Sequence, residues 1–307
     1  MDGFAALAMT LKIRLELSMN AAAAKTYVLT ISCADAVGIV ASVSGYLSGQ
    51  NLFITESAHY GDKETGRFFM RTVFVAKPGQ ISLDDLKNDF AAVAERFGLD
   101  WKIHDAGVKP RILILVSKFD HCLNDLLYRY RTGALPVEIP AVVSNHPDLQ
   151  RVVEWHGIPY HHLPVTKETR AQQEGKILEM IDRLNIDLVV LARYMQVLSP
   201  EMCRALSWRT INIHHSFLPS FKGAKPYHQA YARGVKIIGA TAHYVTTDLD
   251  EGPIIEQGVE RIDHTFTAED FVSLGRDIEN LVLSRAVKFH VEHRVIANGA
   301  KTVVFRR

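Results

Sequence analysis

The chain has 307 residues, of which 48% are hydrophobic and 22% are charged, and this composition excludes intrinsic disorder for most of its length. Lys and Arg number 35 and Asp and Glu 34, so a net charge of +1 offers no basic excess for nucleic-acid binding. No run of about 18 apolar residues predicts a membrane span. Cys33, Cys122 and Cys203 lie far apart, which favours a reducing cytoplasm over a disulfide framework.

Residues 1–24 form an extension ahead of the first predicted domain. Its apolar part precedes Lys12, Arg14 and Glu16, which is the reverse of the order in a secretory signal. We predict a flexible segment or a short helix, and Met19 is an alternative start. We assign the extension no function.

Residues 25–107 predict a first domain with the element order βαββαβ. The alternation of Tyr27, Leu29 and Ile31 indicates a strand. This order is that of the ferredoxin-like split unit. Strands are expected over 26–33, 52–60, 67–75 and 99–104, and helices over 38–48 and 84–97.

Small residues between the first strand and the first helix, from Asp35 to Gly38, would let the helix N-terminus face a ligand or a partner. Together with the element order, they resemble an ACT domain, a module that commonly binds an amino acid and pairs with a copy of itself. The resemblance implies an amino-acid effector site at Asp35, Gly38 and Asn51, and a homodimer or homotetramer. The alternative is a dimerisation module that binds no ligand.

A second domain is predicted over 110–307, after the boundary at Lys109-Pro110-Arg111. Continuous apolar runs indicate strands buried on both faces, and their alternation with helices predicts a doubly wound, mostly parallel α/β domain. A hairpin around Asn298-Gly299 closes the chain. Strands are expected near 112–117, 138–144, 160–163, 187–192, 209–213, 237–245 and 253–261, and helices near 121–131, 148–156, 168–184 and 267–292.

The densest polar constellation follows one of the later strands. Asn212 and His214 are two residues apart, so both project on one face of an extended segment, at the strand end where this fold binds ligands. An amide beside an imidazole suits a carbonyl that becomes an oxyanion, because the amide stabilises negative charge and the imidazole transfers a proton. The acidic loop that follows supplies a carboxylate. By spacing alone, Asp248, Asp250 and Glu251 are equal candidates for this carboxylate.

The segments NIHHSFLP at 212–219, LARYMQVLSP at 191–200 and LDEGP at 249–253 resemble the formyltetrahydrofolate-dependent formyltransferase/hydrolase superfamily. The superfamily pattern N-x-H-x-S-x-L-P, followed by L-D-x-G-P, implies that Asn212, His214 and Asp250 are catalytic, and it selects Asp250 over its neighbours. The resemblance further implies a folate pocket lined by Arg193, Tyr194, Met195, Val197, Leu198, His215, Ser216, Gly223, Thr247 and Asp248.

One branch of this superfamily acts on glycinamide ribonucleotide and has a glycine-rich phosphate loop, whereas the segment from Ser117 to Leu123 contains no glycine. A second branch, which formylates methionyl-tRNA, has a further nucleic-acid-binding domain that we do not expect here. From about residue 25 to 307 the chain resembles the branch that hydrolyses 10-formyltetrahydrofolate.

The resemblance implies 10-formyltetrahydrofolate as substrate, water as acceptor, and no permanently bound cofactor. It also implies a role in balancing one-carbon folate pools and supplying formate for purine synthesis. The alternatives are a formyltransferase that acts on an unphosphorylated amine, and a non-catalytic amino-acid or folate sensor.

Four histidines, His214, His215, His228 and His243, form no recognised zinc motif, so we predict no metal site. Cys122 is interpreted as a small buried residue rather than a nucleophile.

Overall fold

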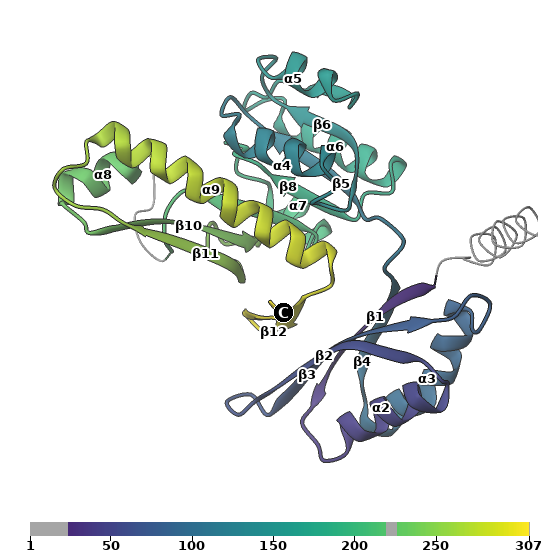
Figure 1. Cartoon of the computed structure of the whole chain (residues 1–307). Coiled ribbons are helices and arrows are strands. Elements are labelled where there is room, and N and C mark those ends of the chain that lie inside the picture. The colour runs from purple at the N-terminus through teal and green to yellow at the C-terminus, as the bar shows by residue number, and fades with distance from the viewer. Residues whose placement is uncertain (1–23, 219–225, 307) are drawn as a thin grey trace, which may run out of the picture. The chain divides into compact units, whose positions relative to one another are not determined.

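The computed structural model describes residues 24–218 and 226–306 (Figure 1). The chain divides into two compact units, with the boundary between Val108 and Lys109. Residues 1–23 of the predicted extension and the predicted folate contact Gly223 lie outside the described residues.

The first unit has the predicted βαββαβ order. Its four strands form a sheet in the order β2-β3-β1-β4, in which β1 is antiparallel to both β3 and β4. Tyr27, Leu29 and Ile31 of β1 share a buried core with Leu86 and Phe90 of α3, so the apolar face of the strand lies under the helices. The elements are β1 (Lys25–Ala34), α2 (Ile39–Gly49), β2 (Phe53–Asp62), β3 (Arg67–Ala76), α3 (Leu83–Phe97) and β4 (Asp100–Asp105).

The second unit contains a sheet in the order β11-β10-β9-β8-β5-β6-β7. The pairs from β9 to β7 are parallel, whereas β10 is antiparallel to both β9 and β11, so the prediction of a mostly parallel sheet is confirmed. The strands are β5 (Arg111–Val116), β6 (Glu138–Ser144), β7 (Tyr160–His162), β8 (Leu188–Leu191), β9 (Thr210–His214), β10 (Ile237–Tyr244) and β11 (Ile254–Arg261), followed by the hairpin of β12 (Val295–Asn298) and β13 (Lys301–Val304).

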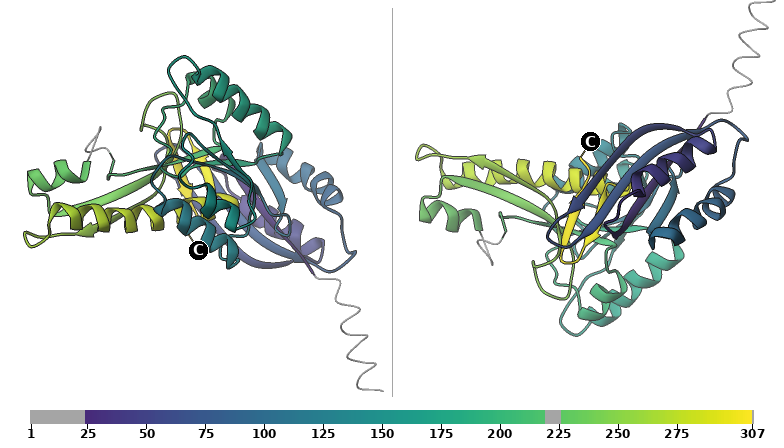
Figure 2. Two further views of the ribbon diagram at one scale, coloured as in Figure 1. Left: turned by 90° about the horizontal axis from the view of Figure 1, so that it is seen from above. Right: turned by 90° about the horizontal axis from the view of Figure 1, so that it is seen from below.

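Helices cover both faces of this sheet (Figure 2). Alternate residues of β5 show the division: Ile112 and Ile114 pack in the core with α4, α5, α8 and α9, and Leu113 and Leu115 pack in the core with α6 and α7. In the described part of the chain, no helix is both long and apolar enough to cross a membrane. The helices are α4 (His121–Arg131), α5 (Gln150–Trp155), α6 (Arg170–Arg183), α7 (Pro200–Ala205), α8 (Pro226–Arg233) and α9 (Ala268–Val291).

Helices α7 and α8 are absent from the sequence prediction. A start signal for α7 was present, because Ser199 caps the backbone N–H of Met202 and Pro200 occupies the first turn.

The ends of β5 and β8 meet at the point where the chain changes direction across the sheet. From β5 the strands proceed outward to β6 and β7, and β8 then returns to the other side of β5. Backbone hydrogen bonds tie the two ends together, from Ala192 N to Leu115 O at 2.9 Å and from Ser117 N to Arg193 O at 3.3 Å. Open α/β sheets bind their ligands in the crevice at such a switch point.

Candidate active site

Three polar side chains lie on one face of the β9–β10 pair. Asn212 and His214 alternate along β9, as their spacing predicts. In the antiparallel register His243 of β10 lies opposite Asn212, and residues opposite one another project to the same face. The strand pairing therefore adds His243 to the two predicted residues.

Asp250 reaches this group from the loop that joins β10 to β11. Its Oδ1 lies 3.2 Å from His214 Nδ1 and 3.8 Å from His243 Nε2. The loop passes very close to β10, since a Cβ on Gly252 would lie 1.7 Å from the carbonyl oxygen of Tyr244. A glycine at this position is what allows Asp250 to approach the histidines.

The contacts of His243 fix its tautomer. Its Nδ1 lies 2.9 Å from the carbonyl oxygen of Tyr244, and a carbonyl only accepts, so Nδ1 carries the hydrogen. Burial lowers the pKa of His243, which keeps the ring neutral and makes Nε2 an acceptor. Asn212 Nδ2 donates to that Nε2 across 3.3 Å. His243 thus orients the Asn212 amide. The second N–H of that amide is left for another acceptor.

His214 has one engaged nitrogen and one open one. Its Nδ1 faces Asp250, whereas its Nε2 is buried and has no hydrogen-bond partner among the described residues. An unsatisfied buried polar atom costs about 1–3 kcal/mol, so Nε2 marks a place for a substrate atom. The hydrogen bond from His214 is the main reason that the pKa of Asp250 lies below its usual value, and Asp250 is therefore ionised at neutral pH.

A cavity of about 260 Å³ opens over these side chains. Met195 and Val197 form part of its wall and are about half exposed, which gives the cavity an apolar lip. Ser216 is buried outside the lining, where its carbonyl accepts from Thr241 Oγ1. Of the predicted folate contacts, the lining includes Arg193, Tyr194, Met195, Val197, Leu198, His215, Thr247 and Asp248.

Asp35 and Gly38 of the first unit line a separate open pocket together with His59 and Phe68. Asn51 lies beyond the C-terminal end of α2, whereas Gly38 precedes the N-terminal end of that 11-residue helix. At 1.5 Å per residue, the two are separated by about 16 Å along the axis. The structure therefore does not bring Asn51 to the other two predicted residues.

Comparisons with known proteins show which family the chain belongs to. Residues 110–287 match the family described as Formyl transferase. A formyltetrahydrofolate deformylase from Corynebacterium sp. (strain P-1) is 51% identical over 280 residues, which cover 91% of this chain and 98% of the relative. The chain belongs to the formyltetrahydrofolate deformylase family.

Solved structures of a deformylase and of a transformylase are similar to this chain. The crystal structure of a formyltetrahydrofolate deformylase from Burkholderia mallei ATCC 23344 is 52% identical and has a TM-score of 0.87, and the alignment covers 92% of this chain and 99% of that one. Glycinamide ribonucleotide transformylase 1 from Symbiobacterium toebii is 28% identical with a TM-score of 0.61, covering 66% of this chain and 97% of that one. The deformylase-family chain thus shares a substantial part of its fold with a transferase.

A second polar group, missed by sequence reasoning, surrounds Glu279 of α9. We define the Glu279 cluster as Glu279, His121, Arg193 and Tyr227. His121 Nε2 lies 2.8 Å from Glu279 Oε2, Tyr227 donates to Oε1 across 2.8 Å, and Arg193 Nε lies 3.4 Å from Oε2. Burial would raise the pKa of Glu279, but His121 and Arg193 outweigh it and hold that pKa below its usual value.

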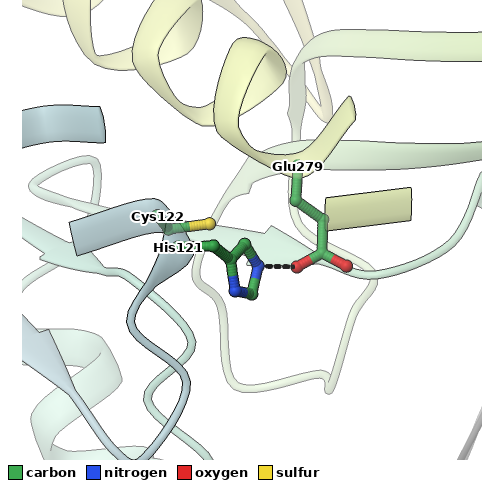
Figure 3. Close-up of side chains that lie close together, drawn as sticks. All are labelled: His121, Cys122 and Glu279. Atoms are coloured by element: carbon green, nitrogen blue, oxygen red, sulfur yellow. Dashed lines mark hydrogen bonds and ion pairs between the residues drawn. The ribbon is translucent and has the colours of Figure 1, made fainter. Parts of the chain in front are cut away.

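Cys122 lies beside this cluster (Figure 3). Burial raises the pKa of its thiol well above the usual value, which agrees with the interpretation of Cys122 as a buried, unreactive residue. Ligand atoms of His121, Cys122 and Glu279 lie within 4.8 Å of one another, a spacing that a metal ion could bridge. The guanidinium of Arg193 already neutralises Glu279 and would repel a cation there.

Proposed function

We propose that the chain hydrolyses 10-formyltetrahydrofolate to tetrahydrofolate and formate, with water as the formyl acceptor. The observation that carries the proposal is the His214–Asp250 pair at the wall of a cavity, beside an oriented Asn212 amide. Within residues 24–218 and 226–306, the buried Nε2 of His214 has no hydrogen-bond partner.

The reaction begins when a water molecule is activated by Asp250. Oδ1 of Asp250 faces both histidines, so Oδ2 is the atom positioned to accept a proton from water. The water oxygen forms a bond to the formyl carbon as its proton passes to the carboxylate. A general base placed in this way contributes a rate factor of about 10²–10⁴.

Negative charge then develops on the formyl oxygen. The remaining N–H of the Asn212 amide and the Nε2–H of protonated His214 donate to this oxyanion, while Asp250 balances the charge of the imidazolium. Donors aimed in advance at a developing oxyanion are usually the largest single contribution to such catalysis.

Collapse of the tetrahedral intermediate breaks the bond between the formyl carbon and the folate amine nitrogen. That nitrogen takes the proton that Asp250 accepted, and formic acid ionises to formate on release. Each proton transfer is assigned to a side chain of the chain itself, so the proposed reaction uses no resident cofactor or metal. Met195, Val197 and Leu198 form an apolar wall for the folate ring system.

Release of formate from 10-formyltetrahydrofolate by the purified full-length chain, without any amine, tests the proposal. We expect equal amounts of formate and tetrahydrofolate, unchanged after chelation and nearly abolished in Asp250→Ala. Formyl retention until an amine is added would instead establish a transferase. Folate binding without turnover under either condition would establish a sensor.

We further propose that the first unit pairs with a second copy of this chain, as dimer or tetramer, and binds an amino-acid effector through Asp35 and Gly38. The exposed side chains of Val37 and Phe53 and the pocket beside Gly38 support this proposal. The three free, buried cysteines fit a cytoplasmic enzyme, whose formate product would supply purine synthesis. Light scattering and inhibition assays with glycine and methionine, on the parent and on Asp35→Ala, test the assignment.

A further inference from the structure

The switch-point crevice between β5 and β8 is filled by the chain's own side chains. This fold places ligands there, next to the N-terminus of the helix that follows the first strand. In this chain His121 begins that helix, α4, and Arg193 follows the end of β8. Both side chains converge on Glu279, whose side chain is only 1% exposed. Protein groups therefore occupy the place of a ligand.

The Glu279 cluster is assembled from four separate segments. His121 comes from α4, Arg193 from the end of β8, Tyr227 from α8 and Glu279 from α9, and Figure 3 shows the His121–Glu279 contact. One carboxylate thus receives three partners. Such convergence holds the walls of the crevice together.

The sequence of α9 makes room for this arrangement. Gly275 lies four residues before Glu279, and a Cβ at that position would lie 2.2 Å from Tyr227 Cζ. A glycine inside a helix is less stable than alanine by roughly 0.5–1 kcal/mol. The helix therefore gives up stability at a position that allows the tyrosine ring to lie over it and donate to Glu279.

Arg193 connects the crevice with the catalytic cavity. Its backbone has φ of 62°, a left-handed conformation that is uncommon for a residue other than glycine and costs about 1–3 kcal/mol. Its guanidinium lies 5.3 Å from the centre of the Phe119 ring, and Arg193 is also one of the residues that line the cavity with Asn212 and His214. Arg193 is therefore the one member of the Glu279 cluster that also lines this cavity.

We propose that the Glu279 cluster closes the crevice against an amine acceptor, so that water alone reaches the formyl carbon. This inference rests on the proposed hydrolysis. Arg193 is the specificity-determining residue that fills the entrance, and the other three members hold it in place. A relative that shares part of this fold is instead named a glycinamide ribonucleotide transformylase, and glycinamide ribonucleotide is an amine.

The test measures how the formyl group divides between water and an added amine. Full-length protein is supplied with formyl-labelled 10-formyltetrahydrofolate and excess glycinamide, and labelled formate and labelled formylglycinamide are quantified. The variants are Arg193→Gly, in which glycine accepts the positive φ, and Phe119→Ala, which removes the ring under the guanidinium without altering the cavity wall. Trp155→Ala, at an exposed aromatic residue at the end of α5, is the matched control.

We expect the parent and Trp155→Ala to release formate, with formylglycinamide no higher than the detection limit, which sets the upper bound on their product ratio. Arg193→Gly should raise the ratio of formylglycinamide to formate at least tenfold, and Phe119→Ala should raise it less. An unchanged ratio in folded, active Arg193→Gly would overturn the inference and leave the cluster a purely structural role. If Arg193→Gly has no turnover, an unchanged ratio in Phe119→Ala overturns it. A parent that releases no formate in the absence of glycinamide would refute the proposed hydrolysis itself.

Discussion

Two polar clusters lie at the strand ends of the second unit, and they differ in what they leave unsatisfied. In the group of Asn212, His214 and Asp250, His214 Nε2 is buried without a partner in the part of the chain that the structure describes. In the Glu279 cluster both carboxylate oxygens have partners, although Arg193 Nε, 3.4 Å from Oε2, forms no hydrogen bond within the described residues. The difference teaches that an imidazole nitrogen open to a cavity marks the position of a reacting substrate, whereas a carboxylate with partners on both oxygens closes a crevice that the same fold could use for a ligand.

The largest expected effect concerns Asp250. Asp250→Ala should lower kcat by about 10²–10⁴, because the base that activates water is lost. The free energy of unfolding should fall by about 1–3 kcal/mol, because His214 Nδ1 loses its partner. Steady-state rates, folate titration and thermal melts check this. Glu251→Gln, at the adjacent position, should retain the parent rate, and loss of folate binding in Asp250→Ala would contradict a catalytic role.

At Glu279 we expect a substitution to act mainly on the stability of the fold, whereas at Asp250 it acts mainly on the rate. Glu279→Gln leaves the buried guanidinium of Arg193 without its counter-charge, a loss that typically costs about 3–5 kcal/mol of stability. Urea unfolding measures the cost. Glu201→Gln removes an exposed ion pair with Arg204 and should cost less than about 1 kcal/mol. Equal unfolding midpoints for the two variants would show that the Glu279 cluster does not hold the crevice closed.

Asn212 should stabilise the transition state and not the bound substrate. Asn212→Ala removes one oxyanion donor, and we expect kcat to fall by about 10²–10³ with little change in the folate dissociation constant. Asn124→Ala removes an exposed amide on α4 and serves as the control. A variant that bound folate weakly but kept its kcat would assign Asn212 to ground-state binding instead.

The smallest expected effect concerns a histidine outside both clusters. Burial lowers the pKa of His290 to about 4, below the usual 6.5, so the unfolded state binds the proton more readily between these values. The stability contribution is complete above pH 6.5 and falls as the pH drops toward 4, by about 1–2 kcal/mol between pH 7 and 5. Across this pH range, the urea midpoint should decline less in His290→Gln than in the parent.

Sequence reasoning predicted the strands and most helices, because buried parallel strands and amphipathic helices have clear periodicities. It also placed Asn212 and His214 on one face, since their spacing of two depends only on local geometry. Spacing did not select Asp250, because a loop has no periodicity, and only the family resemblance did so. His243 contacts Asn212 from 31 residues away, through an antiparallel register that no local pattern encodes.

Glu279 was missed for a related reason. In a 24-residue helix with many charged residues, one glutamate resembles its solvated neighbours. Its burial depends on three partners from distant segments, which only the tertiary packing brings together.

The identity of the formyl acceptor is the central point, and turnover in oxygen-18 water with excess glycinamide tests it most directly. We expect every molecule of formate to carry one heavy oxygen from the solvent, and no formylglycinamide to form. Formate without the heavy isotope, or formylglycinamide as the main product of the parent chain, would contradict the proposal that Asp250 activates water in a cavity closed to amines.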